Sequence, residues 1–222
     1  MKKNPSTFTS VKAIGLALVF VAAFDGTAWG QGIIHVVPST PFYYSDLPSS
    51  QNIDINGDGI PDFNLNSPNG IQIDLNPLNQ NSVLAVPEPS PDIGVLIAAL
   101  MPGAVISTSP SSLDPVFVWY GTNSIYGGSA GIVAASNIGS IGYFQSNTNA
   151  YAGFQLSVGG ENYLGWLYIQ NLGLNIGQIT SWAYQSSPNT SIPAGAVPEP
   201  TTLTLLAIGA AALLVRQRKF AL

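Results

Sequence analysis

The chain has 222 residues, no cysteine, one histidine and only 8% charged residues. All six Lys and Arg residues lie in the first 12 or the last seven positions, whereas ten of the eleven acidic residues lie between positions 31 and 200. The stretch 31–200 therefore has a formal charge of −10, against −5 for the whole chain. Because the stretch 31–200 has no Lys or Arg side chain to neutralise phosphate groups, its composition excludes nucleic-acid binding. It cannot form Lys or Arg salt bridges, and it has no disulfide to stabilise it.

Residues 1–30 have the three parts of a secretory signal peptide. Lys2 and Lys3 form the positive start, residues 13–24 are apolar, and Ala28-Trp29-Gly30 is a small-x-small cleavage site. We therefore expect export and a mature chain that begins at Gln31. A retained N-terminal anchor is the alternative, although Asp25 and Gly26 interrupt the apolar run.

The stretch 31–185 predicts one domain of short β-strands. Runs of Val, Ile and aromatic residues alternate with Gly, Pro, Asn and Ser, and no amphipathic helical period is present. Strands are expected at 33–37, 62–65, 71–75, 83–86, 95–100, 116–120, 131–134, 141–145, 151–158, 162–169 and 178–184. This pattern predicts an all-β fold, a two-layer antiparallel β-sandwich of jelly-roll-like type. A signal helix and a C-terminal transmembrane helix would flank it.

The last three of these strands allow predictions about side-chain faces. Gly159-Gly160 predicts a hairpin turn between 151–158 and 162–169. In 162–169 the odd-numbered and even-numbered positions are both largely apolar, so we expect a central strand covered on both faces. In 178–184, alternation places Ile179 with Ala183 and opposite to Trp182. Trp166 and Trp182 are expected to be core aromatics.

The clearest chemical motif is the run Asp54-Ile55-Asn56-Gly57-Asp58-Gly59-Ile60-Pro61-Asp62. Oxygen-bearing side chains stand at positions 1, 3, 5 and 9 of this loop and glycine at position 6, as in the front part of an EF-hand-type calcium loop. The predicted ligands are the side chains of Asp54, Asn56, Asp58 and Asp62 and the backbone carbonyl of Ile60.

Leu65 stands where the bidentate glutamate of an EF-hand would be, and the flanking residues predict loop and strand. The loop thus resembles those of dockerins, thrombospondin repeats and other extracellular β proteins. Asp46, Asp74 or water would complete the ligand shell. The alternative is a turn without any ion, which explains the glycines but not three neighbouring acids without a cation. We expect a structural Ca²⁺ and no other cofactor.

We expect no enzymatic activity and no catalytic residues. His35 is the only imidazole, and the sequence contains no phosphate-binding glycine loop. Binding of carbohydrate is the alternative function, because exposed aromatic rings stack on sugar faces. The aromatic residues available for this are Tyr43, Tyr44, Trp119, Tyr120, Tyr126 and Trp182.

The tail has three parts in a fixed order. Residues 186–197 are polar and contain proline, which predicts a flexible stalk. Val197-Pro198-Glu199-Pro200 then precedes an uncharged apolar run at 201–215, and Arg216, Arg218 and Lys219 follow. This order predicts a short transmembrane helix whose basic end stays cytoplasmic. Val86-Pro87-Glu88-Pro89 repeats the first part, but the apolar run after it is too short to span a membrane and no basic cluster follows.

The segment 197–222 resembles the PEP-CTERM sorting signal of Gram-negative bacteria, through Val197 to Pro200, the run Leu203–Val215 and the three basic residues. The resemblance implies an exosortase as partner and membrane anchoring of the chain until that enzyme processes it. It also implies delivery to the cell surface or extracellular matrix, with a link to exopolysaccharide and biofilm. We therefore expect a structural or interaction protein of the cell surface.

Overall fold

The computed structural model describes residues 32–45, 47–68, 72–87, 94–114, 116–122, 129–136, 139–141, 143–144, 149–173 and 175–198. The predicted signal peptide and transmembrane helix lie outside these residues. The described part forms fifteen strands and one 3₁₀ turn, which confirms the all-β fold. The elements are β1 (Ile33–Val36), β2 (Phe42–Tyr44), β3 (Ser49–Ile53), β4 (Phe63–Ser67), β5 (Gln72–Pro77), β6 (Ser82–Pro87), β7 (Gly94–Ile97), β8 (Val105–Ile106), η1 (Pro110–Ser112), β9 (Val118–Gly121), β10 (Ser129–Ser136), β11 (Gly139–Ile141), β12 (Ala150–Val158), β13 (Glu161–Gly173), β14 (Ile176–Gln185) and β15 (Ile192–Pro193).

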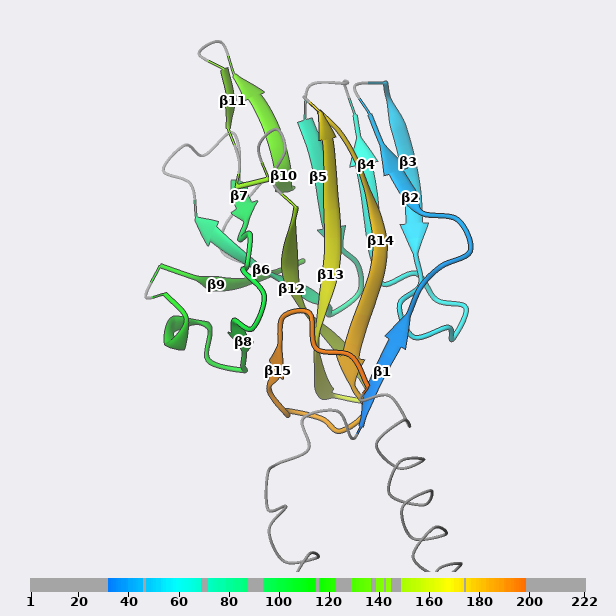
Figure 1. The fold of residues 1–222 in the computed structure, drawn as a ribbon, viewed down its shortest axis with the longest axis vertical. Helices are drawn as coiled ribbons and strands as arrows, with labels where there is room; N and C mark the ends of the chain where they lie inside the picture. Colours follow the sequence, from blue (N-terminus) through cyan, green and yellow to red (C-terminus); the bar gives the residue numbers. More distant parts are fainter. Residues whose placement is uncertain are drawn as a thin grey trace, which may run out of the picture.

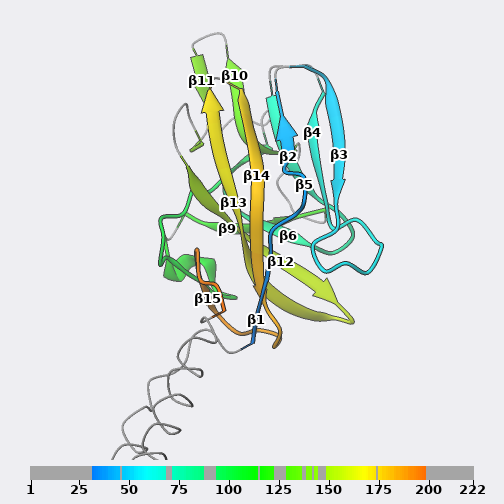
Figure 2. The same ribbon diagram turned by 45° about the vertical axis from the view of Figure 1, so that its right-hand side comes forward.

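Thirteen of the strands belong to one sheet. Its order is β1-β14-β13-β12-β6-β7-β10-β5-β4-β3, with β2, β9 and β11 paired to β14, β6 and β10. The sheet curls so that its two ends approach each other (Figures 1 and 2). The Gln51 side chain of β3 donates a hydrogen bond to the Tyr43 carbonyl of β2 at 2.6 Å. The two predicted layers are therefore parts of one curled sheet, in place of the two separate sheets of a jelly-roll-like sandwich.

One strand pair departs from the predicted antiparallel arrangement. β7 and β10 run parallel, with Ser129 opposite Gly94 and Gly131 opposite Leu96. A parallel pair needs a long connection, and here the chain passes through β8, η1 and β9 between the two strands. The sequence carried no sign of this crossover, because β8 and η1 are too short to stand out in the pattern.

The inner faces of the curled sheet enclose the main core. Phe63 of β4 and Phe154 of β12 meet across it, with ring centroids 5.7 Å apart. On β13, Leu167 and Ile169 face this inner core, whereas Leu164 and Trp166 face a second core on the outer side. The prediction of a central strand covered on both faces is confirmed, and so are the buried positions of Trp166 and Trp182. Gly159 and Gly160, both with positive φ, form the predicted hairpin turn.

A β-bulge corrects the predicted faces of β14. Ser181 pairs with Tyr168, but the next partner of Ile169 is Ile179, so Thr180 is an extra residue. An extra residue inverts the alternation beyond it. Ile179 therefore lies in the inner core together with Trp182, not on the face of Ala183.

The predicted flexible stalk is wrong for residues 191–196, which pack on the domain. β15 pairs with β8, and Ile192 and Ala194 are 0% and 2% exposed. These residues cover the outer core formed by Leu164, Trp166 and their neighbours. The short apolar positions inside a polar stretch gave too weak a pattern to predict this packing. We call residues 186–196 the C-terminal clasp.

Tyr44 generates a prediction about stability. Its side chain is 1% exposed, and its hydroxyl has no hydrogen-bond partner within the described residues. Burial raises the pKa of this hydroxyl. Tyr44→Phe should therefore leave the free energy of unfolding unchanged or raise it by about 1 kcal/mol, since an unsatisfied buried hydroxyl is removed.

The pH dependence of the same variant follows from the raised pKa. The unfolded tyrosine loses its proton near pH 10, whereas the folded one keeps it, so this contribution to stability falls as pH rises above about 10. Urea unfolding of Tyr44→Phe between pH 8 and pH 11 should show a weaker alkaline loss than the wild type. Tyr43→Phe, at an exposed neighbour, should behave like the wild type. An equal alkaline loss in both variants would contradict the assignment.

Candidate functional site

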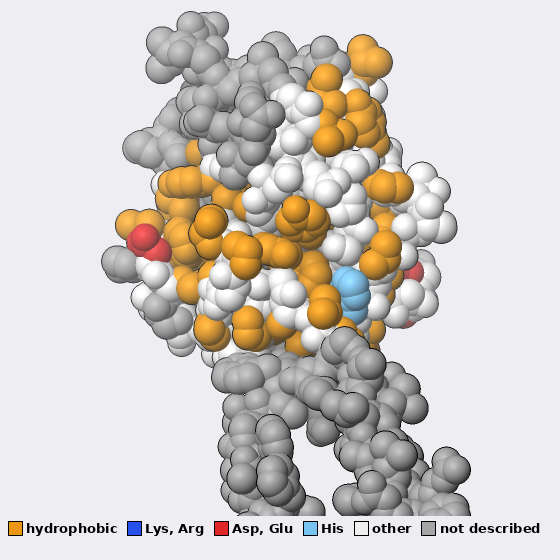
Figure 3. Space-filling model, viewed as in Figure 1, with side chains coloured by type: hydrophobic (Ala, Val, Ile, Leu, Met, Phe, Trp, Pro, Cys, Tyr) orange, Lys and Arg blue, Asp and Glu red, His pale blue; other side chains and the backbone are white. Residues whose placement is uncertain are grey.

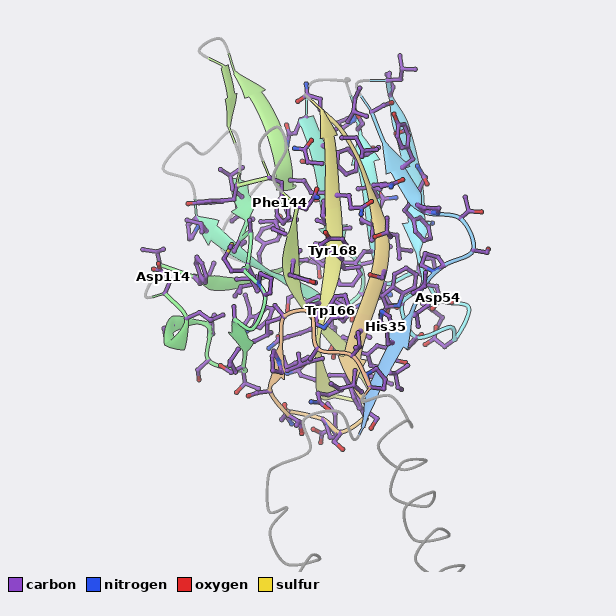
Figure 4. The ribbon with its side chains drawn as sticks, viewed as in Figure 1. His35, Asp54, Asp114, Phe144, Trp166 and Tyr168 are labelled. Carbon is purple, nitrogen blue, oxygen red and sulfur yellow. The ribbon has the colours of Figure 1, made fainter. Side chains whose placement is uncertain are left out.

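The predicted calcium loop connects β3 to β4 at one end of the curled sheet (Figure 4). The two carboxylate oxygens of Asp54 accept hydrogen bonds from the backbone N–H groups of Gly57 (2.7 Å) and Gly59 (2.8 Å). Both glycines have positive φ, 78° and 87°, a conformation that other residues rarely adopt. The chain thus wraps around the Asp54 side chain as the glycine spacing predicts.

The middle of the loop is a series of short side-chain to backbone turns. The Asn56 side-chain oxygen accepts from the Asp58 N–H at 3.0 Å, and the Asp58 carboxylate accepts from the Ile60 N–H at 2.8 Å. The Asn56 amide also donates to Asp58 at 3.0 Å. Ile60 itself is 57% exposed. These hydrogen bonds form successive Asx turns, which order the middle of the loop.

Asp62 fixes the loop to the domain. It is 6% exposed, and its carboxylate accepts hydrogen bonds from the Ile55 N–H (2.8 Å) and the Asn81 side-chain amide (2.9 Å). Burial raises the pKa of this carboxyl; the two hydrogen bonds lower it, and the charges of Asp54 and Asp58 raise it further. Asn81 was not identifiable from the sequence as a partner of Asp62, because only the fold brings the start of β6 beside the loop.

Trp182 of β14 provides a second attachment. Its indole N–H donates to the Ile55 carbonyl at 3.0 Å, across 127 residues of chain. The loop is therefore held from the central part of the sheet as well as from β6.

The five predicted ligand residues share one loop, and their oxygens are of the type that calcium prefers. Within the residues that the structure describes, however, no three acidic or histidine side chains converge as metal ligands. Asp74 lies opposite Asn66, roughly 10 Å along β4 from the end of the loop at Phe63, and so does not complete this shell. Asp46 lies outside the described residues. Calcium binding by the loop stays a prediction.

The structure corrects the choice of aromatic residues for sugar binding. Tyr44, Tyr120 and Trp182 are buried in the inner core. Trp119 is half-buried, with its indole N–H bonded to the Thr108 carbonyl at 3.2 Å. Tyr126 lies outside the described residues, which leaves Tyr43 as the exposed member of the predicted set.

A different group of side chains lines the outer face of β2, β12, β13 and β14, from the edge of the C-terminal clasp outward. Tyr151 and Tyr168 are half-buried neighbours whose ring centroids lie 5.0 Å apart. Further along β14, Gln178 stands opposite Gln170 of β13 on one side and Tyr43 of β2 on the other. The Gln178 side-chain amide donates a hydrogen bond to the Gln170 side chain at 2.8 Å. We call these five residues the open outer face.

The open outer face carries no charge. In the view of Figure 3 the described surface over β13 and β14 is apolar and neutral, and acidic side chains lie only near its margins. Next to Tyr151 and under the clasp lies Trp166, whose ring contacts His35, with ring centroids 5.7 Å apart. His35 thus belongs to β1, where a strand was expected, and the structure places it beside Trp166.

The predicted processing motif begins where the domain ends. Val197 and Pro198 are exposed, whereas Glu199, Pro200 and the basic residues Arg216, Arg218 and Lys219 lie outside the described residues. The family model for the PEP-CTERM protein-sorting motif matches residues 196–219. This chain carries a PEP-CTERM sorting motif.

The motif implies export, anchoring in a membrane and processing by an exosortase, as the resemblance in the sequence predicted. No curated protein and no solved structure is significantly similar to the chain. In the described part of the chain no helix is long and apolar enough to cross a membrane. The helix predicted at 201–215 lies outside that part.

Trp182 allows a test of how the loop is held. Trp182→Phe leaves the buried Ile55 carbonyl without its donor and should lower the free energy of unfolding by about 1–3 kcal/mol in urea. It should also speed hydrogen exchange within residues 54–62. Trp119→Phe removes a similar indole bond at a half-exposed site and should cost less than about 1 kcal/mol. Equal costs would show that the buried contact is not what holds the loop.

Proposed function

We propose that this PEP-CTERM protein is a non-enzymatic structural or interaction component of the cell surface or extracellular matrix. The observation that carries the proposal is the sorting motif at 196–219, which starts where the folded domain ends. The chain would be exported through its signal peptide, anchored briefly in the inner membrane and released from that anchor by the exosortase. The link to exopolysaccharide and biofilm rests on the resemblance to PEP-CTERM proteins.

The chemistry of the domain supports a binding or scaffold role. The stretch 31–200 has ten acidic residues and no Lys or Arg, and its net negative charge favours solubility outside the cell. The same stretch offers no Lys or Arg side chain to which an anionic polymer could bind. His35, the chain's one histidine, lies beside the ring of the buried Trp166.

The sorting route can be tested with a control built into the chain. Glu199→Ala changes the Pro-Glu-Pro of the tail, and Glu88→Ala changes the same three residues of the internal copy. In a host that contains the exosortase, we expect Glu199→Ala to accumulate as the unprocessed membrane-bound form. Glu88→Ala should be processed like the wild type, as followed by the apparent mass of the chain in membrane and extracellular fractions. Normal processing of Glu199→Ala would contradict the proposed route.

We further propose that Ca²⁺ orders the loop Asp54–Asp62. The proposal is supported by the spacing of Asp54, Asn56, Asp58, Ile60 and Asp62 and by the positive φ of Gly59, which lets the loop wrap around one point. A cation would also relieve the repulsion that Asp54 and Asp58 exert on the buried Asp62. The ion would stabilise the loop and take no part in catalysis.

Thermal unfolding tests the calcium proposal. At a free Ca²⁺ concentration ten times Kd, binding adds about 1.4 kcal/mol and should raise Tm by about 4 °C relative to excess chelator. Asp58→Asn should abolish this increment. Asp114→Asn removes one charge at another loop aspartate that accepts a backbone N–H, and should keep the increment. A wild-type Tm that does not respond to Ca²⁺ would contradict the proposal.

Carbohydrate binding is the second candidate function, and the open outer face favours it. Two adjacent tyrosine rings can stack on sugar faces, and the Gln170–Gln178 amide pair can bond hydroxyl groups. Because the face is uncharged and the domain has no cation, a neutral polysaccharide fits better than an anionic one.

Glycan binding can be measured by titration with neutral and acidic polysaccharides. If the open outer face binds sugar, Tyr168→Ala should weaken binding of a neutral glycan by about tenfold or more, through loss of a stacking ring. Leu172→Ala, an exposed change on the same strand, should have little effect. Absence of binding to any glycan would leave the structural role as the function.

A further inference from the structure

The C-terminal clasp is attached to the domain along its whole length. At its start, the Ser186 N–H donates to the Gly32 carbonyl, and the Asn189 N–H donates to the Asn162 carbonyl at 2.7 Å. In its second half, Ile192 pairs with Ile106 in a two-stranded sheet. Ala194 then exchanges backbone hydrogen bonds with the turn at Gly103 and Ala104, both at 2.8 Å.

The last attachment is at Ala196. Its carbonyl accepts a hydrogen bond from the indole N–H of the buried Trp166 at 3.0 Å. Just before it, Gly195 has φ 81° and lies so close to Tyr151 that a Cβ atom there would meet the tyrosine hydroxyl at 2.8 Å. Val197 and Pro198, directly after Ala196, are exposed. Attachment thus ends at the first residue of the sorting motif, which begins at 196.

The clasp also completes the outer core. Ile192 and Ala194 pack with Leu164 and Trp166 of β13 and with Ile106 of β8, all of them buried. Removing the clasp would expose this apolar cluster to water, at a cost of about 25 cal/mol for each Å². The clasp therefore belongs to the stable domain, before and after the tail is processed.

The attachment at Ala196 limits how far the domain can stand from the membrane. Five residue steps separate Ala196 from Thr201, where the apolar run begins, and they span at most about 18 Å. A free stalk that started at Gln185 would span up to about 56 Å. Docking of the clasp thus brings the folded domain close to the bilayer surface.

We propose that the C-terminal clasp presents the sorting motif to the exosortase from a fixed position on the folded domain. The enzyme cleaves on the C-terminal side of Ala196, with the domain held close to the membrane, and the mature protein keeps the clasp as its closing segment. The surface that meets the enzyme and the bilayer is then the end of the domain from which Val197 emerges. This inference rests on the proposed processing by an exosortase.

Limited proteolysis of the full chain in membrane vesicles tests whether the clasp is docked. Proteinase K fragments identified by mass spectrometry should end at or after Val197, and residues 191–196 should resist cleavage. Ile192→Asp places a charge in the outer core and should make 191–196 sensitive, whereas Val105→Asp, at an exposed position of the paired strand β8, should not. Trp166→Phe removes the indole bond to Ala196 together with part of the packing under the clasp, and should raise cleavage at 194–198 several-fold.

A linker insertion tests the distance to the membrane. Because the chain has no cysteine, Ser187→Cys gives a single labelling site for fluorescence energy transfer to acceptor lipids. Inserting about ten Gly and Ser residues between Ala196 and Val197 adds roughly 18 Å of reach. It should lower the transfer clearly if the docked clasp holds the domain near the bilayer. Unchanged transfer would overturn that part of the proposal.

Co-expression with the exosortase then locates the cleavage. The mature C-terminus should lie at or beyond Ala196, and a C-terminus before Ala196 would overturn the proposal. So would a wild-type clasp as sensitive to proteinase K as that of Ile192→Asp. A chain that the exosortase leaves intact would instead contradict the proposed sorting route, and the proteolysis result would still decide whether the clasp is docked.

Discussion

The structure depends on the packing of β13, the strand that both cores share. On its inner side the Phe154 ring lies directly over Gly165, where a Cβ atom would come within 2.2 Å of the ring and 2.5 Å of the Ala183 carbonyl. On its outer side Trp166 is buried under the clasp. Because only glycine fits between Phe154 and β14, this contact sets the close approach of β12, β13 and β14. The curled sheet, the loop and the clasp are all attached to these three strands.

The absence of Lys and Arg from the domain shapes how its polar groups are satisfied. Asn81 is a clear example: its side chain donates to Asp62 at 2.9 Å and accepts from the Ser157 N–H at 2.8 Å. The Asn171 side-chain amide likewise donates to the carbonyl of Phe144 at 2.7 Å (Figure 4). Amide side chains can donate and accept at once, so they join segments that a salt bridge would join in other proteins. The acidic character of the domain is thereby compatible with a well-packed interior.

The functional features lie on three separate parts of this frame. The loop Asp54–Asp62 is held by Asn81 and Trp182, the open outer face is built on β13 and β14, and the sorting motif leaves the domain from the clasp. Only the last is identified by similarity to known proteins. Since the clasp and the open outer face occupy the same side of the sheet, the domain presents its uncharged aromatic surface beside the point where the tail emerges.

The sequence by itself determined the all-β class, the hairpin at Gly159-Gly160, the two apolar faces of β13 and the sorting motif. Each of these depends on local pattern: alternation with period two, a turn that requires glycine, or a linear signal read along the chain. Only the tertiary structure decided the parallel pairing of β7 with β10, the bulge at Thr180, the buried state of Tyr44 and Tyr120, and the docking of residues 191–196. These depend on contacts between residues far apart in the chain, and a short strand such as Ile192–Pro193 acquires its conformation from the partner it covers.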